Sequence, residues 1–121
     1  NLSGAYDLYP SQLSGGMLKR AALARAIIMD PSLLFCDEPG AGLDPISLAS
    51  LDELILTLRE QMNMSIIIIT HEVSSILRIA DRIIFIDQGE LAFQGPLREA
   101  LKSNIKSVEQ FFEKGKSFPD L

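Results

Sequence analysis

The sequence has 121 residues, of which 47% are hydrophobic and 22% charged, and this globular composition excludes collagen-like, low-complexity and disordered chains. Its 11 basic and 16 acidic residues give a formal net charge of −5, so we expect no nucleic acid partner and no attraction to an anionic membrane. One cysteine and one histidine can form neither an internal disulfide nor a closed zinc site.

Helix-like and strand-like segments alternate along the chain. Good helix formers run from Met17 up to an Asp-Pro pair that ends the helix, and Asp44 can cap a second helix with Pro45 in its first position. In chain order we expect a helix over 17–29, a strand over 33–36, a helix from 45 to near 63, a strand over 66–69, a helix over 73–80, a strand over 83–86, its hairpin partner over 91–93, and helices over 96–102 and 108–114.

The three longer apolar runs have no polar alternation. Runs of this kind are typical of strands buried on both faces in a parallel sheet. The alternation of strands with helices therefore predicts an α/β fold with parallel strands, flanking helices and a C-terminal antiparallel hairpin. The chain contains no linker-like segment, so one domain is expected.

The chain also has features of a piece of a longer protein. It begins at Asn1, without an initiating Met or a signal peptide, and no apolar run approaches the roughly 20 residues that a membrane-spanning helix needs. With a single cysteine, a reducing cytosolic compartment is the expected location.

Polar residues follow each apolar run, where a parallel sheet binds its ligands. Asp37 and Glu38 follow the first run, His71 the second and Asp87 the third. An Asp there can ligate Mg²⁺, a neighbouring Glu can activate a water, and a His can stabilise a phosphoryl charge. We expect the two carboxylates of the Asp-Glu pair and the histidine at one edge of the sheet, although an Asp-Glu pair alone is also typical of a solvated strand end.

A Ser-Gly-Gly loop precedes the first expected helix. In Leu13-Ser14-Gly15-Gly16-Met17, the two glycines allow close approach of an anion, and the helix start offers free N–H groups. Taken alone, the same residues are more typical of an ordinary loop that caps a surface helix.

Four motifs in fixed order change this interpretation: Leu13–Met17, Leu33–Pro39, Gly42–Pro45 and Ile69–Glu72. Their order and spacing resemble the C-terminal half of an ABC-type ATPase, over about residues 10–94. The resemblance implies part of a P-loop NTPase fold, divided into a signature loop and helix (1–31), a core with the Walker B, D-loop and switch-histidine segments (32–95) and C-terminal helices (96–121).

The resemblance also implies roles for the residues at the strand ends. Asp37 would be the Walker B carboxylate that supports Mg²⁺. Glu38 would be the catalytic carboxylate that polarises the attacking water, and His71 the switch histidine that senses the γ-phosphate of ATP.

Other residues are implied to act across a dimer. Ser14, Gly15 and Gly16 would contact the γ-phosphate of ATP held by the opposite subunit, and Asp44 would lie in a D-loop at the dimer interface. The sequence departs from the common pattern at Met17, where glutamine is usual, and at Gly42, where alanine is usual. Neither change removes a side chain expected to perform chemistry.

The P-loop that grips nucleotide in this family, Gly-x-x-x-x-Gly-Lys-[Ser/Thr], is absent from the 121 residues. Gly115-Lys116-Ser117 lacks the first glycine and follows a helix-like segment, so we reject it. We therefore expect no ATP hydrolysis above background from this chain alone. The missing P-loop strand would lie between the second and third strands, and exposed edges there predict re-pairing or self-association.

Finer details resemble the ATPase subunits of MCE-associated phospholipid transporters of bacteria, through Met17, the runs 19–26 and 40–46, and the tail segments 99–101 and 108–112. The implied partners are a second ATPase subunit in a homodimer and transmembrane permease subunits, on the inner face of the cell membrane and without insertion into it. Two alternatives stay open: the C-terminal lobe of a chromosome-maintenance or DNA-repair ABC ATPase, and a non-catalytic interaction module. A coiled coil before the signature would favour the former, and the described sequence has none.

Overall fold

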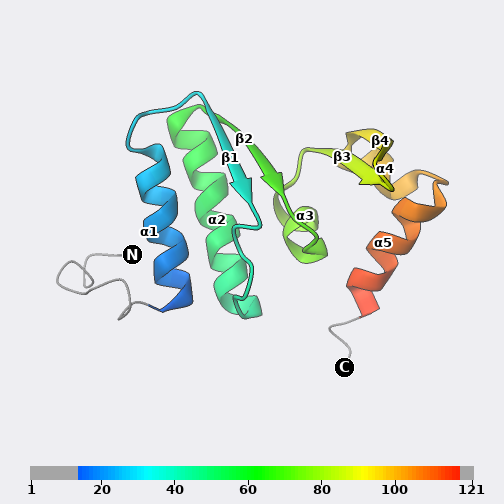
Figure 1. The fold of residues 1–121 in the computed structure, drawn as a ribbon, viewed down its shortest axis with the longest axis horizontal. Coiled ribbons are helices and arrows are strands. Elements are labelled where there is room, and N and C mark those ends of the chain that lie inside the picture. The colour runs from blue at the N-terminus through cyan, green and yellow to red at the C-terminus, as the bar shows by residue number, and fades with distance from the viewer. Residues whose placement is uncertain (1–13, 118–121) are drawn as a thin grey trace. The chain divides into compact units, whose positions relative to one another are not determined.

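The computed structural model describes residues 14–117, which form alternating helices and strands in two compact units (Figure 1). The first unit ends at His71 and the second begins at Glu72. The elements are α1 (Gly15–Ile27), β1 (Leu33–Asp37), α2 (Pro45–Met62), β2 (Ser65–Ile69), α3 (Val73–Ile79), β3 (Arg82–Asp87), β4 (Glu90–Pro96), α4 (Leu97–Lys102) and α5 (Lys106–Ser117). The predicted α/β class, with a parallel pair of strands and a C-terminal hairpin, is confirmed.

The first unit is built on the parallel pair β1 and β2. Leu33 lies opposite Ser65 and Asp37 opposite Ile69, so both strands end at the same edge. Figure 1 shows the two arrows side by side and pointing the same way, with α1 and α2 beside them. This arrangement carries the residue after each strand to one place, as the sequence predicts.

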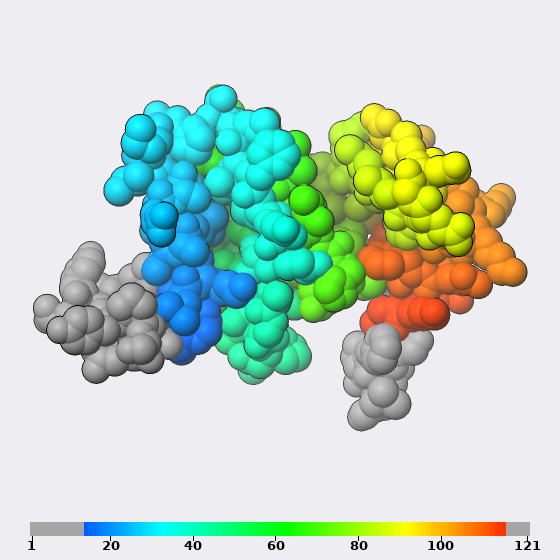
Figure 2. Space-filling view, viewed as in Figure 1, coloured from blue at the N-terminus to red at the C-terminus, as the bar shows by residue number. Residues whose placement is uncertain are grey.

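Burial on both faces of these strands was expected, and the structure corrects this. In β1 the buried and exposed residues alternate: Leu34 is 6% and Cys36 9% exposed, whereas Phe35 is 64% exposed. Ile69 of β2 is 58% exposed, and Figure 2 shows cyan atoms of the β1 region at the surface of the first unit. The reason is that the helices α1 and α2 cover one face, while within residues 14–117 the face with Phe35 stays exposed.

The two helices of the first unit begin at side-chain caps. The Ser14 hydroxyl accepts a hydrogen bond from the Met17 N–H at 3.1 Å, so α1 begins at Gly15, two residues before the expected start. Asp44 caps α2, with Pro45 in its first turn, as predicted. The helix ends at Met62, and the next residue, Asn63, has a left-handed backbone (φ 50°) that turns the chain toward β2. No helix among the described residues is long and apolar enough to cross a membrane.

Cys36 is buried in β1, and this burial raises the pKa of its thiol. A thiol that stays protonated is a poor nucleophile, since the thiolate is the reactive form. This agrees with the sequence-based interpretation of Cys36 as a small apolar residue of the strand.

The second unit is built on the hairpin of β3 and β4, joined through Gln88 and Gly89, both with positive φ. A bulge shifts the register after Phe85. One apolar cluster fills this unit; its most buried members are Val73, Ile83, Ala100, Val108 and Phe112. The ring of Phe111 packs edge-on against those of Phe85 and Phe112, each with centroids 5.3 Å apart.

The final helix is longer than expected: α5 covers Lys106–Ser117 where the sequence predicted 108–114. Gly115, the start of the rejected Gly-Lys-Ser motif, lies inside this helix, and a Cβ there would overlap the side chain of Val73 in α3. The close packing of α5 against α3 therefore explains why a glycine stands at this position. Leu13 of the signature motif, the rest of 1–13 and 118–121 lie outside the described residues.

Strand β3 pairs with β4 and not with β2 in the described chain. The structure therefore describes two separate two-stranded sheets, one in each unit.

Candidate functional site

The side chain of Glu38 is aimed by the backbone at the end of β1. The backbone N–H of Glu38 donates to the carbonyl of Ile69 at 2.7 Å, and this hydrogen bond extends the pairing of β1 with β2 by one residue. The Glu38 φ of 47° lies in the left-handed region, which non-glycine residues adopt at a cost of about 1–3 kcal/mol. The resulting turn brings the Glu38 carboxylate to the end of β2.

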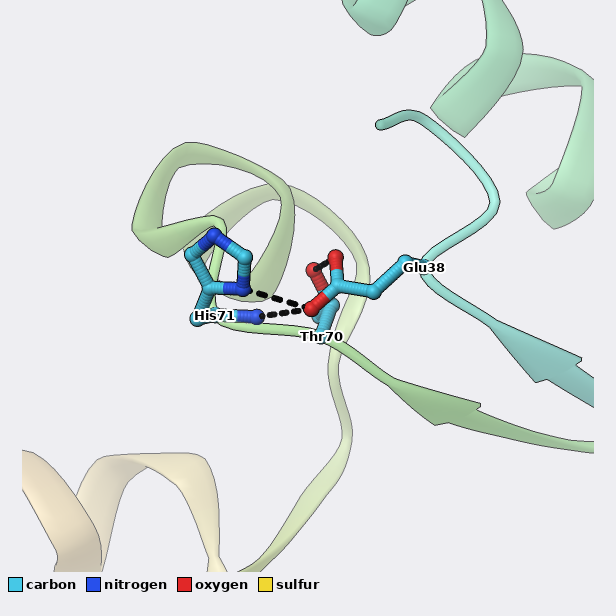
Figure 3. A network of polar contacts seen from close by, with 3 residues as sticks. All are labelled: Glu38, Thr70 and His71. Atoms are coloured by element: carbon cyan, nitrogen blue, oxygen red, sulfur yellow. Dashed lines mark hydrogen bonds and ion pairs between the residues drawn. The ribbon is translucent and has the colours of Figure 1, made fainter. Parts of the chain in front are cut away.

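Three donors from the end of β2 meet the two oxygens of this carboxylate (Figure 3). The Thr70 hydroxyl donates to Oε2 at 3.0 Å. The backbone N–H of His71 donates to Oε1 at 3.1 Å, and Nδ1 of the His71 ring lies 2.6 Å from the same oxygen. Both oxygens are therefore held by two consecutive residues that are 32 and 33 positions away in the sequence.

The contact between the ring and the carboxylate sets where the imidazole proton lies. An ionised carboxylate accepts only, so Nδ1 carries a hydrogen in this arrangement. The neutral ring then has an acceptor at Nε2, and the protonated ring has a second donor there. The side chain of His71 is 77% exposed, so its Nε2 can hydrogen-bond to a bound ligand. The side chain of Glu38 is less accessible, at 27% exposed.

Asp37 ends β1 and is exposed, in register with Ile69. Within residues 14–117 no three His, Cys, Asp or Glu side chains gather as a metal site. A metal at Asp37 would therefore take its other ligands from water and from a bound phosphate. Mg²⁺ is held in this way, by one or two carboxylates with phosphate oxygens and water. The donor set at Asp37 fits Mg²⁺ brought with a nucleotide.

The glycines of the predicted signature loop lie against the predicted D-loop. A Cβ at Gly15 would lie 3.4 Å from Cδ2 of Leu43, and one at Gly16 would lie 4.0 Å from Cβ of Ser47. Both glycines belong to the first turn of α1, directly after the capping Ser14. The structure thus brings this end of α1 beside the residues that flank Asp44.

Asp44 caps α2 through one carboxylate oxygen, which accepts from the N–H groups of Ile46 and Ser47, each at 3.1 Å. Hydrogen bonds from the side chain and the backbone of Ser47 lower the pKa of the Asp44 carboxyl below its usual value of 3.8. One turn further along α2, Ser50 accepts a hydrogen bond from the guanidinium of Arg20 in α1. The two helix starts border one pocket, lined by Ser14, Gly16, Met17, Arg20, Ile46, Ser47, Ser50 and Leu51.

The predicted site residues thus form two groups in the first unit. Ser14, Gly15 and Gly16 lie beside the Asp44 loop, and Glu38 with His71 lies at the strand ends, next to Asp37 in sequence. The contacts are those of the structure, whereas the role of each residue stays a prediction.

The sequence reasoning named neither Thr70 nor Arg20 as a site residue. The signal for Thr70 was its place between the second apolar run and His71, where a hydroxyl reaches the same edge as the Asp-Glu pair. Arg20 gave no comparable signal, because its partner Ser50 is 30 residues away. Asp87 was expected to follow a strand of the sheet. In the structure it is the last residue of β3, where it lies opposite Glu90 at the turn of the β3–β4 hairpin.

Comparisons with known proteins agree with the motifs. A family model described as ABC transporter matches residues 3–41. The intermembrane phospholipid transport system ATP-binding protein MlaF of Haemophilus influenzae is 45% identical over 116 residues, 96% of this chain and 44% of that protein. The methionine import ATP-binding protein MetN of Haemophilus ducreyi is 40% identical over 106 residues, 88% of this chain and 31% of that protein.

Two further comparisons extend this result. A ribonucleotide transport ATP-binding protein, mkl of Mycobacterium leprae, described as probable, is 39% identical over 110 residues, 91% of this chain and 32% of that protein. The structure of a metal-chelate type ABC transporter in an inward-facing conformation matches with a TM-score of 0.78 and 27% identity, over 84% of this chain and 40% of that one. The chain spans less than half the length of these relatives.

Proposed function

We propose that this chain, which belongs to the ABC transporter ATP-binding family, forms the C-terminal part of an ATP-hydrolysing transport subunit. The observation that carries the proposal is the Glu38 carboxylate, held at the strand edge by His71 and Thr70 and beside an exposed Asp37. An acid pair with an imidazole at the ends of parallel strands suits hydrolysis of a phosphate anhydride.

Each residue of this edge has one task in the proposal. Glu38 orients the attacking water and accepts its proton as the water oxygen bonds to the γ-phosphorus and the bond from that phosphorus to the bridging oxygen breaks. His71 donates to the γ-phosphate from Nε2, which requires a protonated ring because Nδ1 already donates to Glu38. Asp37 would hold Mg²⁺, which would neutralise phosphate charge when bound.

The other group of residues acts on a second nucleotide. Ser14, Gly15 and Gly16 offer a hydroxyl and the N–H groups of a helix start to the γ-phosphate of ATP on the opposite subunit. Asp44 stands in the adjoining loop at the subunit interface. The proposal therefore requires a homodimer, in which one site takes its hydrolytic edge and its signature loop from different copies.

The proposed assembly also includes transmembrane permease subunits, with the ATPase dimer on the cytoplasmic face of the membrane. Likeness to the phospholipid transport protein at 45% identity favours a phospholipid or another hydrophobic solute as the transported molecule. The methionine import and ribonucleotide transport relatives have different substrates by name. All are transport proteins, which favours this function over a chromosome-maintenance lobe or a non-catalytic module.

Glu38→Gln in the full-length subunit tests the proposal. The substitution replaces the carboxylate with an amide of the same size that cannot accept the proton. ATP turnover should therefore fall by about 100-fold or more, and an ATP-bound dimer should accumulate. Phosphate release and gel filtration measure the two effects. Glu53→Gln, the same change at an exposed position of α2, is the matched control and should leave turnover unchanged.

Two results would contradict different parts of this proposal. Undiminished turnover in Glu38→Gln would remove Glu38 from its role. Robust Mg²⁺-dependent turnover by the isolated 121 residues would contradict the proposal that nucleotide is gripped by a part of the subunit outside this sequence.

A further inference from the structure

We infer that Thr70 is a positioning residue for the Glu38 carboxylate and that its hydroxyl sets the rate of ATP hydrolysis without contacting ATP. This inference rests on the proposed function and adds a residue to it. It follows from how the two carboxylate oxygens are held, since they are served by different donors.

The terminal torsion of a glutamate side chain is soft, because rotation about its sp³–sp² bond has broad minima. The His71 N–H and the His71 ring both meet Oε1, so together they fix one oxygen. Rotation about the last bond moves both oxygens together, because the carboxylate is planar and rigid. The Thr70 hydroxyl donates to Oε2 at 3.0 Å and stops that rotation.

Thr70 is well placed to hold this oxygen. It directly follows β2, and the parallel pair is extended beside it by the hydrogen bond from the Glu38 N–H to the Ile69 carbonyl. Its hydrogen bond with Glu38 is partly buried, which strengthens it relative to a solvated one. As a β-branched residue Thr70 has a stiff χ1, so its hydroxyl keeps its direction.

A general base must present one lone pair to the attacking water, and its efficiency depends on that geometry. With Thr70 in place, the plane of the carboxylate is fixed before nucleotide arrives. Without the hydroxyl, only the two contacts at Oε1 oppose rotation of the plane, so the plane is held less firmly and fewer water molecules meet an aligned lone pair. Substrate affinity is unaffected, because Thr70 acts through Glu38 and not on the nucleotide.

The test is a set of variants in the full-length subunit, measured as kcat and KM for ATP. Thr70→Val replaces the hydroxyl with a methyl group of similar size and should lower kcat by about tenfold, with KM within about twofold. Thr70→Ser keeps the hydroxyl and should restore most of kcat. Thr57→Val is the matched control, because the Thr57 hydroxyl donates to the Glu53 carbonyl one turn earlier in α2, and it should leave kcat unchanged.

A second measurement separates positioning from a general structural effect. Thr70→Ala should lower kcat as much as Thr70→Val does, and adding Thr70→Val to Glu38→Gln should lower the residual single-turnover rate no further. A normal kcat in Thr70→Val, a loss in Thr70→Ser equal to that in Thr70→Val, a change confined to KM, or an additional loss in the double variant would each overturn the inference. If Glu38→Gln itself retains turnover, the proposed function fails instead, independently of Thr70.

Discussion

The first strand of each unit ends in an Asp, but the surroundings of the two strand ends differ. In the first unit β1 and β2 are parallel, so Asp37 and Ile69 end side by side and the following residues, Glu38 and Thr70, come together beyond them. In the second unit β3 runs into a tight turn, and Asp87 lies opposite Glu90 within the hairpin. A parallel pair collects side chains from distant parts of the chain, whereas a hairpin places only near neighbours together.

Both units bury apolar residues on one face of their strands and expose apolar residues on the other, including Ile84 and Ile86 in the second unit at 66% and 68%. The helices of the second unit close over the hairpin, and Val108 and Phe112 are 0% and 5% exposed. In the first unit the face of the sheet with Phe35 and Ile69 is exposed, at 64% and 58%. Both units thus have a buried core, with Leu51 and Ile55 buried in the first, but only in the first unit does a strand edge gather the predicted site residues.

The largest effect is expected from Phe112→Ala in the 121-residue chain. Truncating this buried ring removes its contact with Phe111 and leaves a cavity, which should lower the free energy of unfolding by about 3–5 kcal/mol. Phe35→Ala makes the same change at a 64% exposed position and should cost less than about 1 kcal/mol. Urea unfolding followed by circular dichroism measures both. Equal losses would mean that the Phe35 face is covered, for instance by the self-association expected from exposed strand edges.

The second-largest effect is expected on ATP turnover, when the end of the parallel pair and the end of the hairpin are altered in turn. His71→Ala in the full-length subunit removes the ring that contacts Glu38 and should reduce ATP turnover by about 100-fold. Asp87→Asn alters the hairpin end and should leave turnover within about twofold of the unaltered protein. Phosphate release assays decide between them. A comparable loss in Asp87→Asn would show that the hairpin turn also takes part in hydrolysis.

The smallest effect concerns the cap of α2. Because hydrogen bonds lower the folded-state pKa of Asp44, the ionised cap stabilises the folded chain above its usual pKa of 3.8, and this stabilisation is lost as the pH falls through the lower folded value. Asp44→Asn keeps a capping side chain without titrating, so this part of the acid dependence should disappear. Unfolding measured between about pH 5 and about pH 2 tests this. An unchanged acid profile in the variant would assign the loss to other carboxylates.

Much of this architecture could be predicted because the signals are local. The cap at Asp44, the turn at Gln88–Gly89 and the apolar run before His71 each reflect a few neighbouring residues. Other features could not. The hydrogen bond from Arg20 to Ser50 joins two helices, and the exposure of Phe35 depends on which elements lie over the strand. Gly115 resembled part of a phosphate loop, but its actual constraint is the Val73 side chain on another helix.

The sequence by itself determined the order of the elements, the strand ends at which polar residues gather and the motifs of the family, because backbone preferences and spacing are carried by adjacent residues. Only the tertiary structure decided that the Glu38 carboxylate has one oxygen on His71 and the other on Thr70. That division depends on the register of β1 against β2 and on the left-handed turn at Glu38, and both arise from packing between segments more than 30 residues apart.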